Sequence, residues 1–315
     1  MRVHFFDECL SRLQIAFCFV FGTVLSVALP AQIQLQILGI AQDAGYPQAA
    51  CRKSCCQAVW GHPEQHQKVV SLGLTDRSQQ KSWLFEATPD FPTQLASLTQ
   101  GNEPTDLAGI FLTHAHMGHY TGLMYLGREA MGAQDVPVYA MPRMMGFLKQ
   151  FGPWSQLVSL HNISLEPIQV GLPISLGDSL SITPLLVPHR DEFSETVGYV
   201  IQGPHKRALF IPDIDKWERW DASILTWIQE VDHAFLDATF FDGEELPGRN
   251  MDEIPHPFVV ESMERFEPLS TSDRAKVIFI HFNHTNPLID PKSEASQQVE
   301  QAGYRIAREG MRVEL

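Results

Sequence analysis

Positive charge is scarce in this chain of 315 residues, where 23 lysines and arginines face 37 aspartates and glutamates for a formal net charge of −14. Proteins that bind nucleic acid non-specifically neutralise phosphates with clustered lysine and arginine, so the composition argues against such a partner. It does not exclude a small phosphodiester substrate, because bound metal cations supply positive charge locally. No run of like charge is long enough to form an interaction tail.

Other features are absent as well. The chain has no Gly-x-Ser-x-Gly run, which excludes the nucleophile elbow of serine hydrolases. Beyond residue 31 no apolar stretch approaches the length of a transmembrane helix, and no repeat or low-complexity linker interrupts residues 32–315. With 44% hydrophobic and 19% charged residues, the chain can bury a sizeable core. We therefore expect one folded domain over residues 32–315.

Residues 1–31 differ from the rest of the chain. Arg2 and Arg12 flank a polar start, an apolar stretch follows up to Pro30, and small residues offer a cleavage point near residues 29–32. This pattern predicts a secretory signal peptide and an exported, periplasmic or extracellular protein. Two alternatives stay open: an uncleaved membrane anchor, which would bring the chain to a membrane, and a buried first element.

Histidines are concentrated in Thr113–Leu123, where His114, His116 and His119 fall within six residues. The stretch lies between an apolar run that reads as a buried strand and residues 123–130, which read as the opening of a helix. An imidazole offers one nitrogen to a metal while a neighbouring group orients the other. His114 and His116, two apart on an extended backbone, can grip one cation. The alternative is a solvated histidine-rich loop.

This stretch resembles the metal-binding motif of the metallo-β-lactamase superfamily, whose usual form is His-x-His-x-Asp-His. Gly118 stands where the family carries an aspartate that helps to hold a second metal. The resemblance implies a hydrolase with one complete and one weakened metal position. Asp43 or Asp90 could complete the weakened position from a nearby loop, although a turn or helix N-cap before Phe91 is the favoured role of Asp90. We expect a Gly118→Asp substitution to restore the carboxylate and raise the metal content. The implied fold is α/β, a four-layer αβ/βα sandwich of two mixed β-sheets.

The resemblance extends to later motifs, each at the end of an apolar strand. It implies that His189 completes the first metal's ligands, that Asp213 bridges two metals, and that His281 closes the set. Asp215 competes with Asp213, and Glu86 matches a structural acid after the third strand. Asp213 and His281 are also the expected catalytic residues. The implied ligands of one or two Zn²⁺ ions, with iron or manganese as alternatives, are His114, His116, His119, His189, Asp213 and His281.

Three of the five cysteines form a cluster after the first predicted strand, and the other two lie in the leader. The cluster consists of Cys51, Cys55 and Cys56. It resembles two branches of the superfamily, the B protein of pyrroloquinoline quinone biosynthesis and the cyclic phosphodiesterase of phosphonate breakdown. In the latter, such cysteines and a distant histidine hold a structural zinc.

The resemblance implies that His284 is this distant histidine, although exchanged roles for His281 and His284 stay open. The spacing Cys-x-x-x-Cys-Cys departs from the usual Cys-x-Cys-x-x-Cys. Because Cys55 and Cys56 are adjacent, we do not expect both to ligate without strain. A disulfide and reduced core thiols are the alternatives to a structural metal.

Further elements follow from apolar periodicity. Residues 157–184 alternate apolar side chains with glycine turns, as antiparallel strands do. Residues 217–229 place large apolar side chains on one stripe, which predicts a helix packed on the core. Asp237 and His256 have counterparts in the quinone-biosynthesis branch, and we assign them to structural support of the site.

The two branches differ in chemistry, since one cleaves phosphodiesters and the other acts on a peptide-derived tyrosine. The intact His-x-His pair and the export signal favour a hydrolase that uses a metal-activated water on a small phosphodiester or other ester. The alternatives are a metal-dependent enzyme similar to the quinone-biosynthesis protein, and a non-catalytic metal- or quinone-binding carrier. The sequence indicates no oligomeric state.

Overall fold

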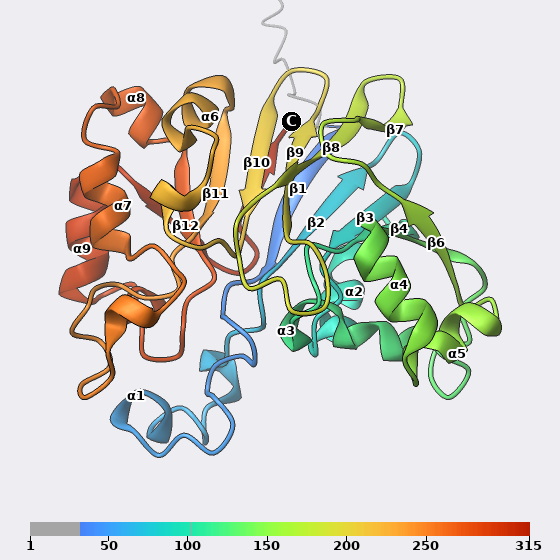
Figure 1. Cartoon of the computed structure of the whole chain (residues 1–315), viewed down its shortest axis with the longest axis horizontal. Coiled ribbons are helices and arrows are strands. Elements are labelled where there is room, and N and C mark those ends of the chain that lie inside the picture. Colours follow the sequence, from blue (N-terminus) through green and yellow to red (C-terminus); the bar gives the residue numbers. More distant parts are fainter. Residues whose placement is uncertain (1–31, 102) are drawn as a thin grey trace, which may run out of the picture. The chain divides into compact units, whose positions relative to one another are not determined.

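The computed structural model describes residues 32–101 and 103–315, so the predicted leader lies outside the described residues. Two sheets of seven strands form the centre of the domain (Figure 1). The first sheet, in spatial order, contains β14 (Arg312–Glu314), β1 (Ile33–Gly39), β2 (Ser71–Asp76), β3 (Lys81–Phe85), β4 (Asp106–Phe111), β5 (Val136–Ala140) and β6 (Ile163–Pro167). The second contains β13 (Arg305–Ile306), β12 (Val277–Ile280), β11 (His233–Asp237), β10 (Arg207–Ile211), β9 (Val197–Gln202), β8 (Leu180–Leu186) and β7 (Ile174–Gly177).

Both sheets are mixed. Strands β14, β1, β2 and β3 pair antiparallel, and β3 to β6 pair parallel. The second sheet repeats this plan, with antiparallel pairs from β7 to β10 and parallel pairs from β10 to β13. The parallel half of a sheet places the carboxyl ends of its strands at one edge, where ligand sites of α/β proteins form.

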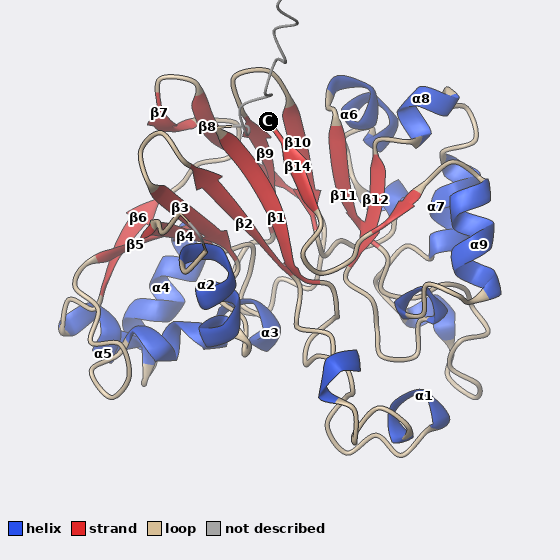
Figure 2. Ribbon diagram, turned by 180° about the vertical axis from the view of Figure 1, so that it is seen from behind, coloured by secondary structure: helices blue, strands red, loops and turns tan. Residues whose placement is uncertain are grey.

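Helices cover the outer faces of both sheets. Figure 2 shows α2, α4 and α5 against the first sheet and α6 to α9 on the side of the second. The helices are α1 (Ser54–Gln57), α2 (Phe91–Thr99), α3 (Met117–Tyr120), α4 (Pro142–Gln150), α5 (Trp154–Ser159), α6 (Ile224–Glu230), α7 (Val259–Arg265), α8 (Thr271–Arg274) and α9 (Glu294–Gln301). The four-layer αβ/βα sandwich expected from the sequence is confirmed.

The sheets pack face to face through a buried aromatic cluster. Phe85 of β3 stacks on Phe111 of β4, with ring centroids 5.2 Å apart. From the opposite sheet, Tyr199 and Phe210 approach Phe85 at 5.5 Å and 5.9 Å. Such pairs add about 0.5–1.5 kcal/mol each beyond their buried area. The cluster therefore joins the strands that carry the candidate site.

The prediction for residues 157–184 is wrong in part. The segment opens with the end of α5, β6 pairs parallel with β5, and only β7 and β8 form an antiparallel hairpin. Apolar alternation is the same in parallel and antiparallel strands, so it does not report strand direction.

Two predicted helices also differ. Residues 217–229 are split into a short 3₁₀ helix, Trp217–Arg219, and α6, because Ser223 caps α6 by accepting from the Thr226 N–H. Residues 123–130 do not continue as an α-helix: α3 is followed by a 3₁₀ helix, Thr121–Leu126, and then by turns.

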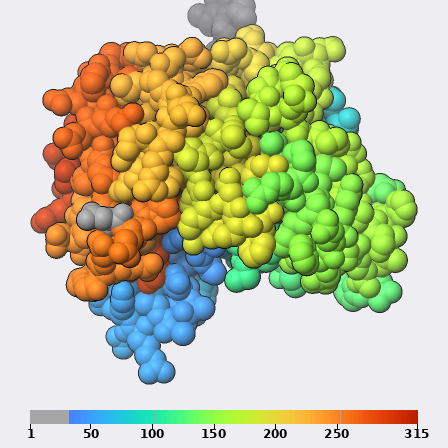
Figure 3. Space-filling view, in the orientation of Figure 1, coloured from blue at the N-terminus to red at the C-terminus, as the bar shows by residue number. Residues whose placement is uncertain are grey.

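The loop after β1 projects from the sandwich and carries α1; it is the blue segment at the bottom of Figures 1 and 3. No helix within the described ranges has the length and hydropathy needed to cross a bilayer.

Candidate metal centre

The six predicted metal ligands lie after strand ends at one edge of the sandwich. Three follow β4, and one each follows β8, β10 and β12. Five of the side chains are at most 3% exposed, and His116 is 14% exposed. The structure thus brings together His114, His116, His119, His189, Asp213 and His281.

A first donor group consists of His114, His116, His189 and Asp213, whose ligand atoms all lie within 4.8 Å of one another. The Asp213 carboxylate is 3.4 Å from Nε2 of His114 and 3.2 Å from Nε2 of His189. Both nitrogens are buried and make no hydrogen bond with any described residue. Buried polar atoms without a partner cost about 1–3 kcal/mol each, so the atoms converge on a point that a cation would satisfy. Three imidazoles and a carboxylate suit zinc.

The protonation of this group favours metal binding. Burial and the neighbouring His119 hold the pKa of His114 well below its ordinary value, which leaves a neutral imidazole. Burial alone would raise the pKa of Asp213, but His189 and His256 hold it well below its ordinary value. His114 therefore offers a free imidazole lone pair beside the ionised carboxylate of Asp213. Although burial lowers the pKa of His116, the carboxylates of Asp213 and Glu192 raise it overall.

A second donor group contains His119, His281 and Asp43, again with ligand atoms within 4.8 Å. Nε2 of His119 is 3.8 Å from the same oxygen of Asp213 that approaches His114. Asp213 thus lies between the two groups, in the place expected of a bridging carboxylate.

A neighbouring group lies beside the other nitrogen, Nδ1, of three buried histidines: His114, His119 and His281. Thr113 Oγ1 lies 2.8 Å from Nδ1 of His114 and donates to Glu86 Oε1. Glu86 Oε1 is also 3.3 Å from Nδ1 of His119. Thr239 Oγ1 lies 2.9 Å from Nδ1 of His281. These contacts point each Nε2 at the centre of the cluster.

Backbone strain coincides with the site. Glu86 and His281 adopt φ values of 77° and 71°, in the left-handed region that non-glycine residues rarely occupy. Each such residue costs about 1–3 kcal/mol, which the surrounding structure must offset. Both side chains face the donor groups, so the strain is associated with their placement.

Asp237 and His256 lie directly beside the predicted ligands, as expected of residues that support the site. Nδ1 of His256 is 2.8 Å from Asp237 and 3.3 Å from Asp213. With His281, these residues form a third buried cluster whose donor atoms lie within 4.8 Å. Although burial raises the pKa of Asp237, His256 and His281 lower it to about 2.

Two competing candidates lie elsewhere. Asp215 pairs with Arg219 at 2.6 Å and accepts from the Lys216 N–H. Asp90 occupies the position before α2 and accepts from the Val69 N–H at 2.8 Å, so it supports a loop. Neither belongs to a donor group among the described residues.

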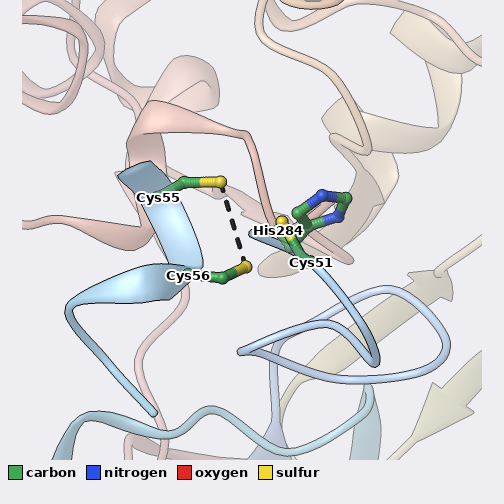
Figure 4. A group of neighbouring side chains, drawn as sticks. All are labelled: Cys51, Cys55, Cys56 and His284. Atoms are coloured by element: carbon green, nitrogen blue, oxygen red, sulfur yellow. Dashed lines mark hydrogen bonds between the residues drawn. The ribbon is translucent and has the colours of Figure 1, made fainter. Parts of the chain in front are cut away.

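The cysteine cluster is assembled with His284. The ligand atoms of Cys51, Cys55, Cys56 and His284 lie within 4.8 Å of one another, and Figure 4 shows the side chains facing a common centre. The three thiols are free, so the disulfide alternative is not what the structure shows.

The structure places both adjacent thiols, Cys55 and Cys56, in one donor group, although we did not expect both to ligate without strain. Their Sγ atoms are 3.9 Å apart. A tetrahedral zinc with Zn–S bonds of about 2.3 Å separates its thiolates by about 3.8 Å. The helical turn of α1 points both side chains to the same side.

A cavity of about 550 Å³ opens beside the histidine cluster. His256, Asp43, Asn283 and His284 line it together with Phe240 and Ile254. Three exposed cations also line it, from three separate loops: Lys53, Arg190 and Arg249.

Sequence reasoning missed the residues that hold the histidine loop in place. Ser194 Oγ accepts from the Ala115 N–H at 2.9 Å, and Glu192 lies 3.0 Å from Nε2 of His116. Thr113 and Thr239 were not singled out, although each lies beside a predicted site residue. Hydroxyl groups at strand ends beside histidines were the available signal.

Comparison with known proteins agrees with this geometry. The profile described as Beta-lactamase superfamily domain matches residues 82–282. Among curated proteins, coenzyme PQQ synthesis protein B of Xanthomonas axonopodis pv. citri is 24% identical over 311 residues, covering 90% of this chain and 100% of the relative. The corresponding protein of Klebsiella pneumoniae is 26% identical, covering 89% and 98%.

Two solved structures share the fold. Zn²⁺-bound PqqB from Methylobacterium extorquens aligns with a TM-score of 0.71 at 20% identity, covering 90% of this chain and 100% of its own. A diphosphatase from the PhnP family aligns with a TM-score of 0.64 at 22% identity, covering 89% and 96%. The chain therefore belongs to the β-lactamase superfamily, and within it resembles the PqqB branch.

Proposed function

We propose that the chain is a metal-dependent hydrolase of small anionic esters, with phosphodiesters as the first class to test. The observation that carries the proposal is the cavity of about 550 Å³ beside the donor groups. It collects Lys53, Arg190 and Arg249 in a protein whose formal net charge is −14. Cations gathered against the overall charge indicate an anionic ligand.

The donor groups fit a metal, as their buried nitrogens without partners indicate. His114, His116, His189 and Asp213 would hold it. A divalent ion there lowers the pKa of water to about 7 and polarises an ester oxygen. The strand-end placement keeps the ligands fixed, while the cavity leaves one side open to substrate.

His256 is the best-placed proton donor to a leaving group. It lines the cavity, and its Nδ1 lies 2.8 Å from the ionised Asp237. Burial lowers the pKa of His256, but the carboxylates of Asp237 and Asp213 raise it overall. Asp237 also accepts from the N–H groups of Ile214 and Thr239, which fixes its orientation. An oriented imidazole at the cavity wall suits proton transfer to a departing alcohol.

The test is a panel of chromogenic esters with the purified chain loaded with Zn²⁺ or Mn²⁺. Bis(p-nitrophenyl) phosphate, p-nitrophenyl phosphate and p-nitrophenyl acetate separate diesters, monoesters and neutral esters. We expect chelator-sensitive turnover of the diester. A metal-loaded protein that hydrolyses none of the three would contradict the proposal and favour a non-catalytic carrier.

Lys53→Met tests the charge argument. We expect the KM for the diester to rise about tenfold, equivalent to about 1.4 kcal/mol, with the KM for the acetate unchanged. Lys81→Met is the matched control, because Lys81 is an exposed cation at the start of β3, and Glu86 beside the histidine cluster follows the other end of this strand. Equal effects of both variants would show that the cavity does not select anions.

A second candidate is supported by the similarity to coenzyme PQQ synthesis protein B over the whole length of that relative. On this account the chain would act on a peptide-derived tyrosine. A mass change in a tyrosine-containing peptide with the metal-loaded protein, without turnover of any ester, would favour this candidate.

A further inference from the structure

Gly118 occupies the position at which the superfamily motif carries an aspartate, and the structure shows why no side chain fits there. A Cβ atom built on Gly118 would lie 1.9 Å from Cβ and 2.8 Å from Cγ of Asp43. Contacts under 3.0 Å are not tolerated between such atoms. The Asp43 side chain therefore fills the volume that a residue 118 side chain would need.

Asp43 also has the right neighbours for this place. Its ligand atom lies within 4.8 Å of those of His119 and His281. Both histidines are fully buried, and Nε2 of each lacks a hydrogen-bond partner among the described residues. Glu86 faces Nδ1 of His119 and Thr239 faces Nδ1 of His281, so the two Nε2 atoms remain for a ligand.

The loop that carries Asp43 is tied to the strand end that carries His281. The Phe282 N–H donates to Ile40 O, and the Gln42 N–H donates to Phe282 O, both at 2.8 Å. Ala41 forms bridges with Phe282 and Val69. Asp43 is therefore held by backbone pairing directly beside its neighbour in the donor group, as a ligand must be.

We propose that Asp43 supplies the carboxylate of a second metal position, which it forms with His119, His281 and a share of Asp213. The carboxylate would then come from the loop after β1 and not from the histidine motif, and glycine at 118 leaves room for it. The geometry argues against the expectation that Gly118→Asp alone raises the metal content, because the new side chain would collide with Asp43.

Exchange of the two residues tests the proposal by metal content, independently of turnover. We compare the full chain with Asp43→Asn, Asp43→Gly, Gly118→Asp and the double variant Asp43→Gly/Gly118→Asp. Each is titrated with Zn²⁺, and bound metal is counted by mass spectrometry. We expect Asp43→Asn, which preserves the shape of the side chain, to bind about one equivalent less or to bind the second ion at least tenfold more weakly.

The double variant is the decisive arm. It should recover the lost equivalent, whereas Gly118→Asp and Asp43→Gly should each bind less metal than the unaltered chain. Recovery would show that either position can deliver the same carboxylate. Unchanged metal content in Asp43→Asn, or a double variant no better than Asp43→Gly, would overturn the proposal.

Co²⁺ substitution keeps the outcome interpretable if a variant folds poorly. Thiolate-to-cobalt charge-transfer absorption reports the cysteine cluster alone, and it should be equal in Asp43→Asn and the unaltered chain. A joint loss of this band and of one equivalent would show that Asp43 supports the structure of both loops and does not act as a ligand of the second ion alone, which would overturn the assignment. Since the readout is metal content, a chain that binds both ions but hydrolyses no ester would refute the proposed function and leave this proposal intact.

Discussion

The two candidate metal centres share the loop after β12, since His281 belongs to the histidine cluster and His284 to the cysteine cluster. They are supported in opposite ways. The histidine cluster sits on ends of buried strands, with His281 fully buried. The cysteines sit on a projecting loop with one helical turn, and Cys51 and Cys55 are only half-buried. The core of the fold fixes the histidine cluster, whereas a metal in the cysteine cluster would itself stabilise a loop that has no core of its own.

This difference separates the roles of the two centres. A centre fixed by strands keeps its geometry without metal and can leave one side open to substrate, as catalysis requires. A centre whose four side chains come from loops and one short helix can gain order when it binds metal, so that binding free energy becomes folding free energy. Loss of metal should therefore affect activity at the first centre and stability at the second.

The largest effect should come from Asp213→Ala. Its carboxylate approaches both donor groups, within 3.4 Å of His114 and 3.8 Å of His119. We expect loss of metal from the histidine cluster and a fall in ester turnover of about a thousandfold, or about 4 kcal/mol. The cysteine cluster should keep its metal. Retention of all bound metal by this variant would refute the bridging role of Asp213.

His281→Ala and His284→Ala compare the two centres directly, because each variant is measured for both activity and Tm. The first should lower activity about a hundredfold with little change in Tm. The second should lower Tm by about 10 °C, the effect of about 3 kcal/mol in a protein of this size, and change activity per folded molecule less than about twofold. Differential scanning fluorimetry and single-concentration turnover measure both. Equal effects of the two variants on both readouts would show that the centres are not distinct.

Much of this arrangement was predictable because local pattern decides it. Apolar runs place β4, β8, β10 and β12, and the candidate ligands follow the ends of these strands. The fold and the family followed from the order of these motifs. By contrast, Asp43 could be named only as one of two donors, because no local pattern reports that a loop after β1 meets the end of β12.

His256 shows the same limit in another form. It follows Asp237 by 19 residues, and the loop between them has no period that would indicate where it returns. The predicted helix boundaries were wrong for a related reason. The Ser223 cap sets the start of α6 and the turns after Leu126 end the preceding 3₁₀ helix, whereas the apolar spacing continues past both positions. The spacing of apolar residues does not predict which distant segments come into contact, nor which single hydrogen bond ends a helix.

Thiol reactivity sharpens the comparison on the cysteine side. Burial raises the pKa of Cys51, but the Lys53 N–H and the neighbouring thiols lower it overall. At Cys56, burial and the neighbouring thiols raise the pKa to about 12. In metal-free native protein at pH 8 we expect Cys51 to react first with a thiol reagent and Cys56 last.

Zn²⁺ should protect all three thiols. After denaturation with a chelator, all three thiols of the mature chain, Cys51, Cys55 and Cys56, should titrate. Only one would titrate if a disulfide joined the other two, and that result would refute the structural metal site.

The smallest effect should come from Glu245, whose loop contacts the residue after His284. Thr285 Oγ1 and the Phe241 N–H both donate to its carboxylate. Burial raises the pKa of Glu245 to about 7. The unfolded value is about 4.3, so the folded state binds this proton more tightly. Its contribution to stability is complete below about pH 4.3 and is lost as the pH rises through about 7.

Glu245→Gln removes the buried charge, while its amide oxygen can accept from Phe241 and its amide nitrogen can donate to Thr285. The variant should therefore gain stability at pH 8, by about 1–2 kcal/mol or about 4 °C in Tm, and gain almost none at pH 5. Glu244→Gln is the matched control, because Glu244 is exposed on the same loop. Thermal melts of both variants at the two pH values measure the difference. A gain of equal size at pH 5 and pH 8 would show that packing, and not the buried charge, limits stability beside the cysteine cluster.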